Sequence, residues 1–197
     1  LIRQAKLESF KEFEDKILGR KTEQGPSQQL GEPNPILNKV TNGKELLKAA
    51  IKLAENRSDK AIIHMLEKVP NLDTVKFTTV NDSTNPKLQG ASGYFDPNTN
   101  IIYVDPRVVD LSHIVEHELL HAATDVEFDK HVKIVNDVHT PLTPLGKKAV
   151  KLFEAFIDES LKSKKAFYAQ KNVKEFFMEA NTDPELKRFL RSEEHTS

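Results

Sequence analysis

The hydrophobic positions of this chain recur mostly at the spacing of an α-helix. Apolar residues return every three or four positions, which places them along one side of a helix and predicts a buried stripe. The clearest stripe consists of Val150, Phe153, Phe156, Ile157 and Leu161. Pro144, just before it, is suited to the first position of a helix. On this basis we expect helices at residues 41–57, 58–69, 111–124, 143–164, 172–181 and 182–190.

Between the second and third of these helices the pattern changes to alternation. Residues 74–80 read "TVKFTTV", and residues 92–96 and 100–105 flank a turn-type Asp-Pro-Asn-Thr sequence. Alternating apolar residues bounded by turn residues are typical of strands, so we expect a small antiparallel or mixed sheet here. Residues 125–140 show no regular pattern. The prediction is an α+β fold that is mainly helical.

The two ends of the chain read differently from its centre. Residues 1–20 have the pattern of a charged amphipathic helix, which we interpret as the end of a truncated upstream region. Residues 21–36 are rich in Gly, Pro and Gln and are predicted to be a linker, so the domain is expected at residues 37–191. The final "RSEEHTS" can be back-translated as AGA TCG GAA GAG CAC ACG TCT, a sequencing-library adapter read in frame. We therefore expect residues 192–197 to be an artificial tail.

Composition narrows the classes of function. The chain has 29 Lys and Arg against 30 Asp and Glu, a formal net charge of -1, which indicates no nucleic-acid partner and no membrane partner. It contains no cysteine, so His, Asp and Glu are the strong metal ligands it offers. We find no signal segment and no apolar run as long as a membrane span, so we expect a soluble chain. Compartment and oligomeric state are not indicated.

The helix expected at residues 111–124 contains "HELLH", which begins at His117. Residues four apart lie on the same side of a helix, about 6 Å apart along its axis, so the imidazoles of His117 and His121 can bind one zinc ion. Glu118 between them can act as general base on a water whose pKa the zinc lowers. His113 lies about 12 Å from His121 along the axis. We therefore expect it to be a hydrogen-bonded neighbour of the site.

A catalytic zinc normally takes three protein ligands and leaves one position open. In one common arrangement the third ligand follows the second histidine by six residues. That position is Glu127 here, without the glycine and histidine usual in that pattern. Asp125, His131 and His139 are nearby alternatives that lack a recognisable spacing. The third ligand therefore stays open at this point.

The other common arrangement takes a glutamate from a later helix. The chain offers "EFFMEA", in which Glu175 and Glu179 stand one turn apart with Phe176, Phe177 and Met178 between them. These apolar residues indicate a largely buried helix, where a carboxylate needs a cation or hydrogen-bond donors. Both glutamates are therefore candidates for the metal site.

"HELLH" followed by "EFFMEA" resembles the catalytic domain of anthrax lethal factor and its relatives, and the metallopeptidase domains of large phage-encoded polyvalent proteins. The resemblance covers about residues 90–190. It implies that Glu175 is the third zinc ligand and that Glu179 orients the site from outside the ligand shell. In that family a tyrosine seven residues before the ligand supports the developing oxyanion, and Tyr168 stands at that interval.

The sequence departs from the family at two positions. Met178 stands where alanine is usual, and Asn181 where an aromatic or small apolar residue is frequent. Neither departure removes a reactive group. The resemblance therefore implies a zincin-like fold with an active-site helix and the activity of a zinc-dependent endopeptidase. Its expected site consists of the Zn²⁺ ligands His117, His121 and Glu175, the catalytic residues Glu118 and Tyr168, and Glu179 outside the ligand shell.

The expected substrate of such an enzyme is a protein or peptide. It would lie extended and add a strand at the edge of the small sheet, just before the active-site helix. The sequence places that edge at Ile101, Ile102, Tyr103 and Val104.

Two other functions stay open. The domain could be a non-catalytic zinc-binding or interaction module within a larger toxin or phage polyprotein, although a purely structural site has no need of Glu118. Alternatively the motif is accidental and the chain is an all-helical adaptor. A structure in which Glu175 lies far from His117 and His121 would exclude the peptidase.

Overall fold

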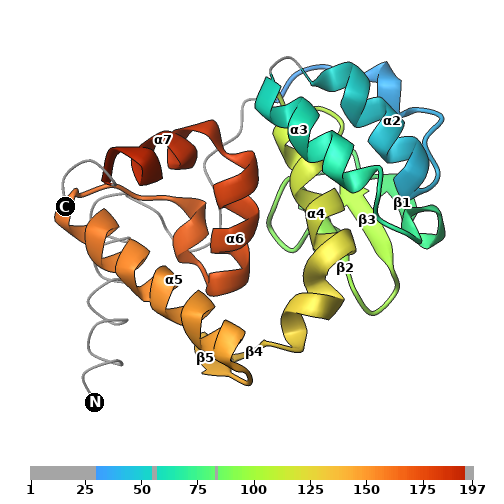
Figure 1. Ribbon diagram of the computed structural model, residues 1–197. Coiled ribbons are helices and arrows are strands. Elements are labelled where there is room, and N and C mark those ends of the chain that lie inside the picture. The colour runs from blue at the N-terminus through green and yellow to red at the C-terminus, as the bar shows by residue number, and fades with distance from the viewer. Residues whose placement is uncertain (1–29, 55–56, 83, 194–197) are drawn as a thin grey trace.

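The computed structural model describes residues 30–54, 57–82 and 84–193, and the fold is α+β (Figure 1). In chain order its elements are η1 (Pro35–Leu37), α2 (Gly43–Leu53), α3 (Arg57–Leu66), η2 (Leu72–Thr74), β1 (Lys76–Thr79), η3 (Pro86–Leu88), β2 (Gly93–Asp96), β3 (Ile101–Val104), α4 (Leu111–Asp129), β4 (Val132–Val135), β5 (Val138–Pro141), α5 (Pro144–Lys162), η4 (Tyr168–Gln170), α6 (Val173–Thr182) and α7 (Pro184–Glu193), where η marks a short 3-10 helix. The expected helix at residues 1–20, the linker as far as residue 29 and the last four residues of the expected tail, 194–197, lie outside the described residues. Residues 192 and 193 of that expected tail belong to α7.

The helices expected within the described residues are confirmed, and local caps explain where they begin. The side chains of Asn42, Thr143 and Asn172 each accept a backbone N–H from the first turn of the following helix, at 2.9 to 3.1 Å. Such caps satisfy N–H groups that have no partner within the helix. Pro144 begins α5 as expected, and Asp183 accepts the backbone N–H of Glu185 at 2.9 Å at the start of α7.

The three-stranded sheet is mixed, with the strand order β1-β3-β2. β1 runs parallel to β3, whereas β2 runs antiparallel to it. β3 is therefore the central strand. The expectation that Ile101, Ile102, Tyr103 and Val104 form a substrate-binding edge is wrong, because both sides of that strand are already paired. Among the described residues, the outer side of β2 carries no further strand.

A hairpin stands where the sequence showed no regular pattern. α4 continues to Asp129, beyond its expected end, and β4 and β5 follow as an antiparallel pair. Asn136 and Asp137 join the two strands with φ of 48° and 61°. Two consecutive residues with positive φ are typical of the tight turn that matches the twist of a hairpin, and Asn and Asp tolerate that conformation. The Asn-Asp pair was the signal that the sequence analysis missed.

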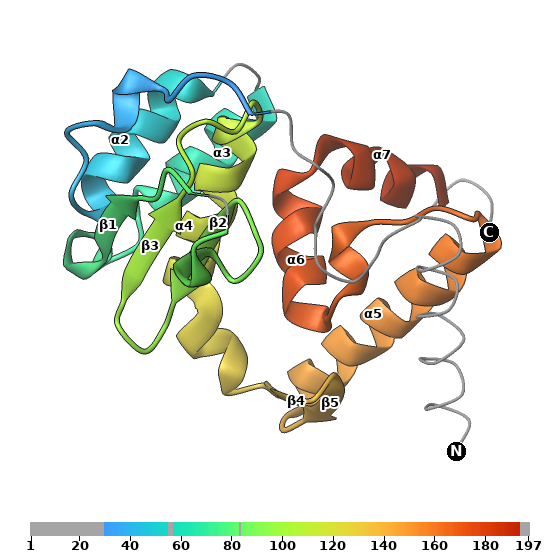
Figure 2. The same cartoon turned by 180° about the vertical axis from the view of Figure 1, so that it is seen from behind.

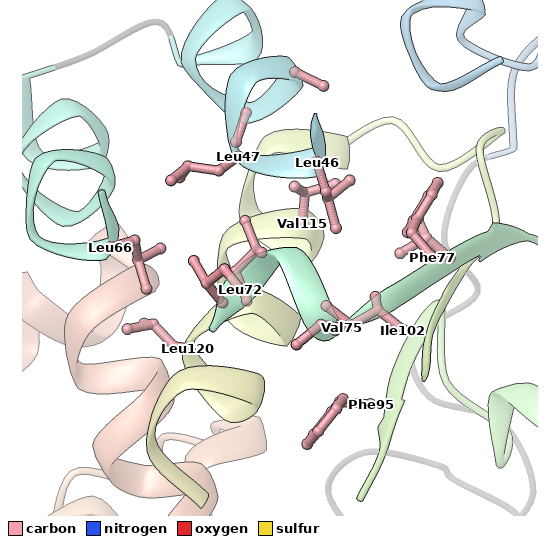
Figure 3. Close-up of a cluster of buried hydrophobic side chains, with 14 of the residues drawn as sticks. Leu46, Leu47, Leu66, Leu72, Val75, Phe77, Phe95, Ile102, Val115 and Leu120 are labelled. Carbon is pink, nitrogen blue, oxygen red and sulfur yellow. The ribbon is translucent and has the colours of Figure 1, made fainter. Parts of the chain in front are cut away.

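The elements form two lobes that lie side by side in both views (Figures 1 and 2). One lobe contains α2, α3, α4 and the three-stranded sheet, and the other contains α5, α6, α7 and the hairpin. Figure 3 shows the buried cluster of the first lobe, which includes Leu46, Leu66, Ile102, Val115 and Leu120. The second core is largely aromatic and includes Phe153, Phe156, Phe176 and Phe189.

α6 takes part in both cores. Its Phe176 is buried in the second core, whereas the next buried apolar residue, Met178, belongs to the first. Thr124 of α4 lies 3.8 Å from the sulfur of Met178. Because both sides of α6 are packed, the helix is held against α4 at the junction of the two lobes.

The last part of the expected linker is joined to the loop after β3. Leu30 forms a bridge with Val108, and the N–H of Gly31 donates to the C=O of Arg107 at 2.7 Å. The N–H of Asn34 donates to the C=O of Pro106 at 2.9 Å.

Within the described part of the chain, no helix is both long enough and apolar enough to cross a membrane.

Candidate metal centre

α4 and α6 bring the three expected ligands together. His117 and His121 stand one turn apart on α4 and are 6% and 7% exposed, and their Nε2 atoms lie 3.0 Å from each other. Glu175 stands in the first turn of α6, where the side chain of Asn172 caps the helix. Its Oε2 lies 2.9 Å from His117 Nε2 and 3.2 Å from His121 Nε2. These are ligand atoms from two helices that converge on one point.

These residues fit a zinc ion. Ligand atoms placed tetrahedrally around zinc at about 2.0–2.1 Å lie roughly 3.4 Å from one another, close to the separations of 2.9 to 3.2 Å found here. Two imidazole nitrogens and a carboxylate oxygen also repel one another at this distance unless a cation or a shared proton lies between them. The structure thus contains a largely buried His/Glu group that could hold a metal ion.

The outer nitrogen of each ligand ring faces a carboxylate. His121 Nδ1 lies 2.9 Å from Asp125 Oδ1. His117 Nδ1 lies 2.8 Å from Glu179 Oε1, close enough for an ion pair, although the contact is not a hydrogen bond. A carboxylate at Nδ1 keeps the ring proton on that side and leaves the Nε2 lone pair for a metal. Glu179 thus lies where the resemblance implied, outside the ligand atoms.

His113 extends this outer layer, as expected for a neighbour of the site. Its Nε2 lies 3.2 Å from Glu179 Oε1, and its Nδ1 lies 3.1 Å from Asp110 Oδ2. His113, His117 and Glu179 also place three ligand-type atoms within 4.8 Å of one another. A neutral imidazole has only one free lone pair, so His117 could bind two metals only by losing its one remaining N–H proton as well. The geometry therefore suits a hydrogen-bonding role for His113.

Glu118 is buried between α4 and the edge strand β2. Burial raises the pKa of Glu118, while the nearby His117 and His121 oppose that rise. The backbone N–H of Phe95 also favours the charged form of the Glu118 carboxylate and lowers its pKa. A raised pKa makes this carboxylate a better proton acceptor, which suits the expected general base.

Negative charge surrounds the two histidine ligands. Burial lowers the pKa of His117, but contacts with Glu175 and Glu179 outweigh this effect and raise the pKa to about 9. Burial likewise lowers the pKa of His121, and Asp125 and Glu175 outweigh it and raise the pKa to about 10. The same contacts hold the pKa of Glu175 and Glu179 below the usual range although burial opposes this. Without a metal, the surrounding carboxylates therefore favour the protonated form of both histidines.

Tyr168 lies beside His117 on the more open side of the site. The two ring centroids are 6.2 Å apart, and Tyr168 is 44% exposed. Burial raises the pKa of Tyr168, and the negative charges of Glu175 and Glu118 raise it further. The hydroxyl therefore stays protonated at neutral pH and can donate a hydrogen bond.

The segment that carries Tyr168 is anchored by the buried Gln170. The Gln170 side-chain amide donates to Ser160 Oγ at 2.8 Å and to the C=O of Lys165 at 3.1 Å, and its oxygen accepts the N–H of Phe167 at 3.0 Å. These bonds fasten the segment to the end of α5. They fix the position of Tyr168 relative to the ligands on α4 and α6.

The other candidates for the third ligand have different surroundings. Glu127 is 64% exposed at its side chain and pairs with a lysine three residues later. His131 hydrogen-bonds the threonine that caps α5, and His139 accepts the first backbone N–H of α6. Asp125 lies on the far side of His121 from Glu175 Oε2, as the partner of Nδ1.

Sequence reasoning missed the contact of Asp125 with His121 and that of Lys174 with α4. Asp125 follows His121 by one helical turn, so the spacing on a single helix face could have revealed the pair. Lys174 Nζ lies 2.6 Å from Asp129 Oδ1 and 3.7 Å from Asp125 Oδ2. No local pattern predicts that contact, because it depends on how α6 packs on α4.

Comparisons of the chain with known protein families, with curated proteins and with solved structures found no match. The function proposed below therefore rests on the residues of this site and on their geometry. The observation that matters most is the convergence of His117, His121 and Glu175, with Glu118 buried beside them.

Proposed function

We propose that this chain is a zinc-dependent endopeptidase of the zincin type. The observation that carries the proposal is the triangle of His117 Nε2, His121 Nε2 and Glu175 Oε2, whose sides measure 2.9 to 3.2 Å. The resemblance of "HELLH" and "EFFMEA" to lethal factor catalytic domains supports it independently. Glu118 favours catalysis over a purely structural zinc site, which would need no extra carboxylate.

Each residue of the site has a separate task in this proposal. His117, His121 and Glu175 would hold zinc, which supplies a lowered pKa for water and polarisation of the scissile carbonyl. Glu118 would take a proton from the attacking water and pass it to the leaving amine. Tyr168 would donate its hydroxyl proton in a hydrogen bond to the oxyanion as negative charge develops.

The substrate would pair with β2 and not with β3. The N–H of Asp105 donates to the C=O of Ser92 at 2.9 Å, which fixes the alternation of the β2–β3 ladder. In an antiparallel pair, the backbone groups of alternate residues point to opposite sides. Those of Gly93 and Phe95 therefore face the outer edge, next to Glu118. An extended peptide added there would bring its own backbone toward the base.

The direct test compares Glu118→Gln with Glu127→Gln, an exposed glutamate on the same helix. Zinc per chain is counted by native mass spectrometry, and cleavage of a peptide mixture is followed by mass spectrometry of the products. We expect all three proteins to hold zinc. Glu118→Gln should cleave at least about 100-fold more slowly than the parent, while Glu127→Gln should match it. Equal cleavage by Glu118→Gln and the parent would contradict the mechanism.

A zinc-loaded parent that cleaves nothing in the mixture would instead favour the alternative. The chain would then be a non-catalytic zinc-binding or interaction module. A folded parent that holds no zinc would exclude both functions.

A further inference from the structure

Two charged contacts cross between α4 and α6 beside the candidate metal centre. Lys174 is the residue immediately before Glu175, and its ammonium group reaches Asp129 at 2.6 Å and Asp125 at 3.7 Å. Both aspartates belong to α4. α6 therefore places the carboxylate of Glu175 beside the two histidines of α4. It also places the ammonium group of Lys174 beside the two aspartates near the end of α4.

Asp125 is the member of this group that touches the site. One of its carboxylate oxygens lies 2.9 Å from His121 Nδ1, and the other faces Lys174. Its side chain is 11% exposed, whereas that of Asp129 is 60% exposed. A largely buried carboxylate needs donors or a cation. Asp125 has both, one from the ligand ring and one from the helix that carries the third ligand.

We propose that Asp125 is a positioning residue for His121 and that Lys174 steadies Asp125 in that role. The inference rests on the zinc site of the proposed function. By accepting the Nδ1 proton in a hydrogen bond, Asp125 fixes both the tautomer and the rotation of the ring, so that the Nε2 lone pair faces the position between His117 Nε2 and Glu175 Oε2 where zinc would lie. Lys174 and Glu175 are adjacent on α6. The packing of α6 against α4 therefore determines both the position of the ligand Glu175 and the contact of Lys174 with Asp125, which orients His121.

The alternative is that Asp125 serves only to join the two helices. Asp129 provides the matched control, because it contacts the same lysine at a shorter distance but does not touch His121. A contact that only joins the helices should depend on both aspartates. A contact that orients a ligand should depend on Asp125 alone.

The test compares Asp125→Asn, Asp129→Asn and Lys174→Gln with the parent, all in the full chain. The zinc dissociation constant is measured by competition with a chelator, and the visible absorption of the Co²⁺-loaded protein reports the geometry at the metal. Urea unfolding of the metal-free proteins reports any general loss of stability. Asn keeps the shape of Asp, so both aspartate variants are expected to fold.

We expect Asp125→Asn to weaken zinc binding about 10- to 100-fold and to change the Co²⁺ spectrum. The zinc dissociation constant of Asp129→Asn should stay within about 3-fold of the parent value, with an unchanged Co²⁺ spectrum. Asp129 does not contact a metal ligand, and affinity is lost only when a partner of a ligand is removed. Lys174→Gln should fall between the two, since its ammonium lies 3.7 Å from Asp125. A parent that binds zinc while both aspartate variants bind it equally well would overturn this inference alone. A parent that binds no zinc would overturn the proposed function as well.

Discussion

Gly93 of β2 lies directly against Glu118 of α4. A Cβ atom at residue 93 would come within 3.0 Å of Glu118 Cγ and within 2.6 Å of Ile114 Cγ2. The absence of a side chain there lets α4 approach the edge strand closely, with the Glu118 carboxylate beside residue 93. Glycine at residue 93 is thus a steric requirement for the present position of the candidate base.

Gly93→Ala should disturb Glu118 and spare the metal ligands. We expect the free energy of unfolding to fall by about 1–3 kcal/mol because the added methyl group overpacks the contact. Zinc affinity should stay close to that of the parent, while kcat for peptide cleavage should fall because the base is displaced. Urea unfolding, chelator competition and peptide kinetics measure the three quantities.

The matched control is Gly31→Ala, whose added Cβ would meet, among the residues that the structure describes, only the Arg107 carbonyl oxygen, at 3.7 Å. That substitution should change stability by no more than about 0.5 kcal/mol. The double variant Gly93→Ala with Ile114→Ala removes the closest clash and should recover part of the lost activity. Normal stability and kcat in Gly93→Ala would show that α4 and β2 do not need this close approach.

Glu175→Gln should separate the third ligand from the other acidic residues. The amide keeps the shape of the side chain but is a poor zinc ligand, so we expect zinc affinity to fall by more than the roughly 10- to 100-fold typical of an outer contact. Glu127→Gln should leave zinc affinity unchanged, because the exposed Glu127 pairs with Lys130 and His131 and not with a proposed zinc ligand. Native mass spectrometry with a chelator series measures both. Full zinc occupancy in Glu175→Gln would mean that another residue completes the site.

Tyr168→Phe tests the proposed oxyanion donor. Removal of the hydroxyl should lower kcat about 10- to 1000-fold, because a donor aimed at the developing charge is lost. KM and zinc affinity should change little, since the ring itself stays beside His117. Tyr103→Phe, in the central strand, is the control and should keep the parent kcat. An unchanged kcat in Tyr168→Phe would remove this residue from the mechanism.

His113→Gln tests whether the second group of ligand-type atoms binds a metal. In our interpretation His113 holds Glu179 by a hydrogen bond, so the parent and the variant should hold the same number of zinc ions per chain. Zinc affinity should weaken in the variant, because Glu179 is then less firmly held at His117 Nδ1. A parent that holds an extra zinc, which is lost in His113→Gln, would identify a second metal site instead.

The metal-free and zinc-loaded proteins should respond to pH in opposite directions. In the metal-free fold, the pKa values of His117 and His121 are raised from 6.5 to about 9 and about 10. Their stabilising contribution is therefore complete below about pH 6.5 and is lost as pH rises through 9 to 10. Glu175 and Glu179 have lowered pKa values, so their contribution is present above about pH 4.5 and is lost in acid.

The metal-free protein should accordingly be most stable between about pH 4.5 and pH 6.5. Zinc must displace the protons on the histidines, so its affinity, and the stability it adds, should increase as the pH rises from about 6.5 to about 9, where the metal-free protein loses stability. Urea unfolding at a series of pH values, with zinc and with a chelator, measures both trends. Parallel trends in the two series would contradict the arrangement of charges at the site.

Local sequence patterns predict the helices and one half of the site. Helical spacing and the caps at Asn42, Thr143 and Asn172 are local properties, so α2 to α7 could be predicted within a few residues. The pair His117 and His121 could be predicted for the same reason, since one helical turn separates them. The resemblance added Glu175, and the structure brings that residue to the pair.

Which strand lies at the edge of the sheet depends on contacts between segments that are distant in sequence. β2 and β3 are neighbours in sequence with similar patterns, and the parallel pairing of β1 with β3 places β3 in the centre. Strand pairing is non-local, so alternation within one strand cannot reveal its partners. The contacts of Glu118 with β2 and of Lys174 with Asp125 are non-local in the same way. They arise where α4 meets β2 and α6, and the distances between packed elements are set by the cores on both sides of them.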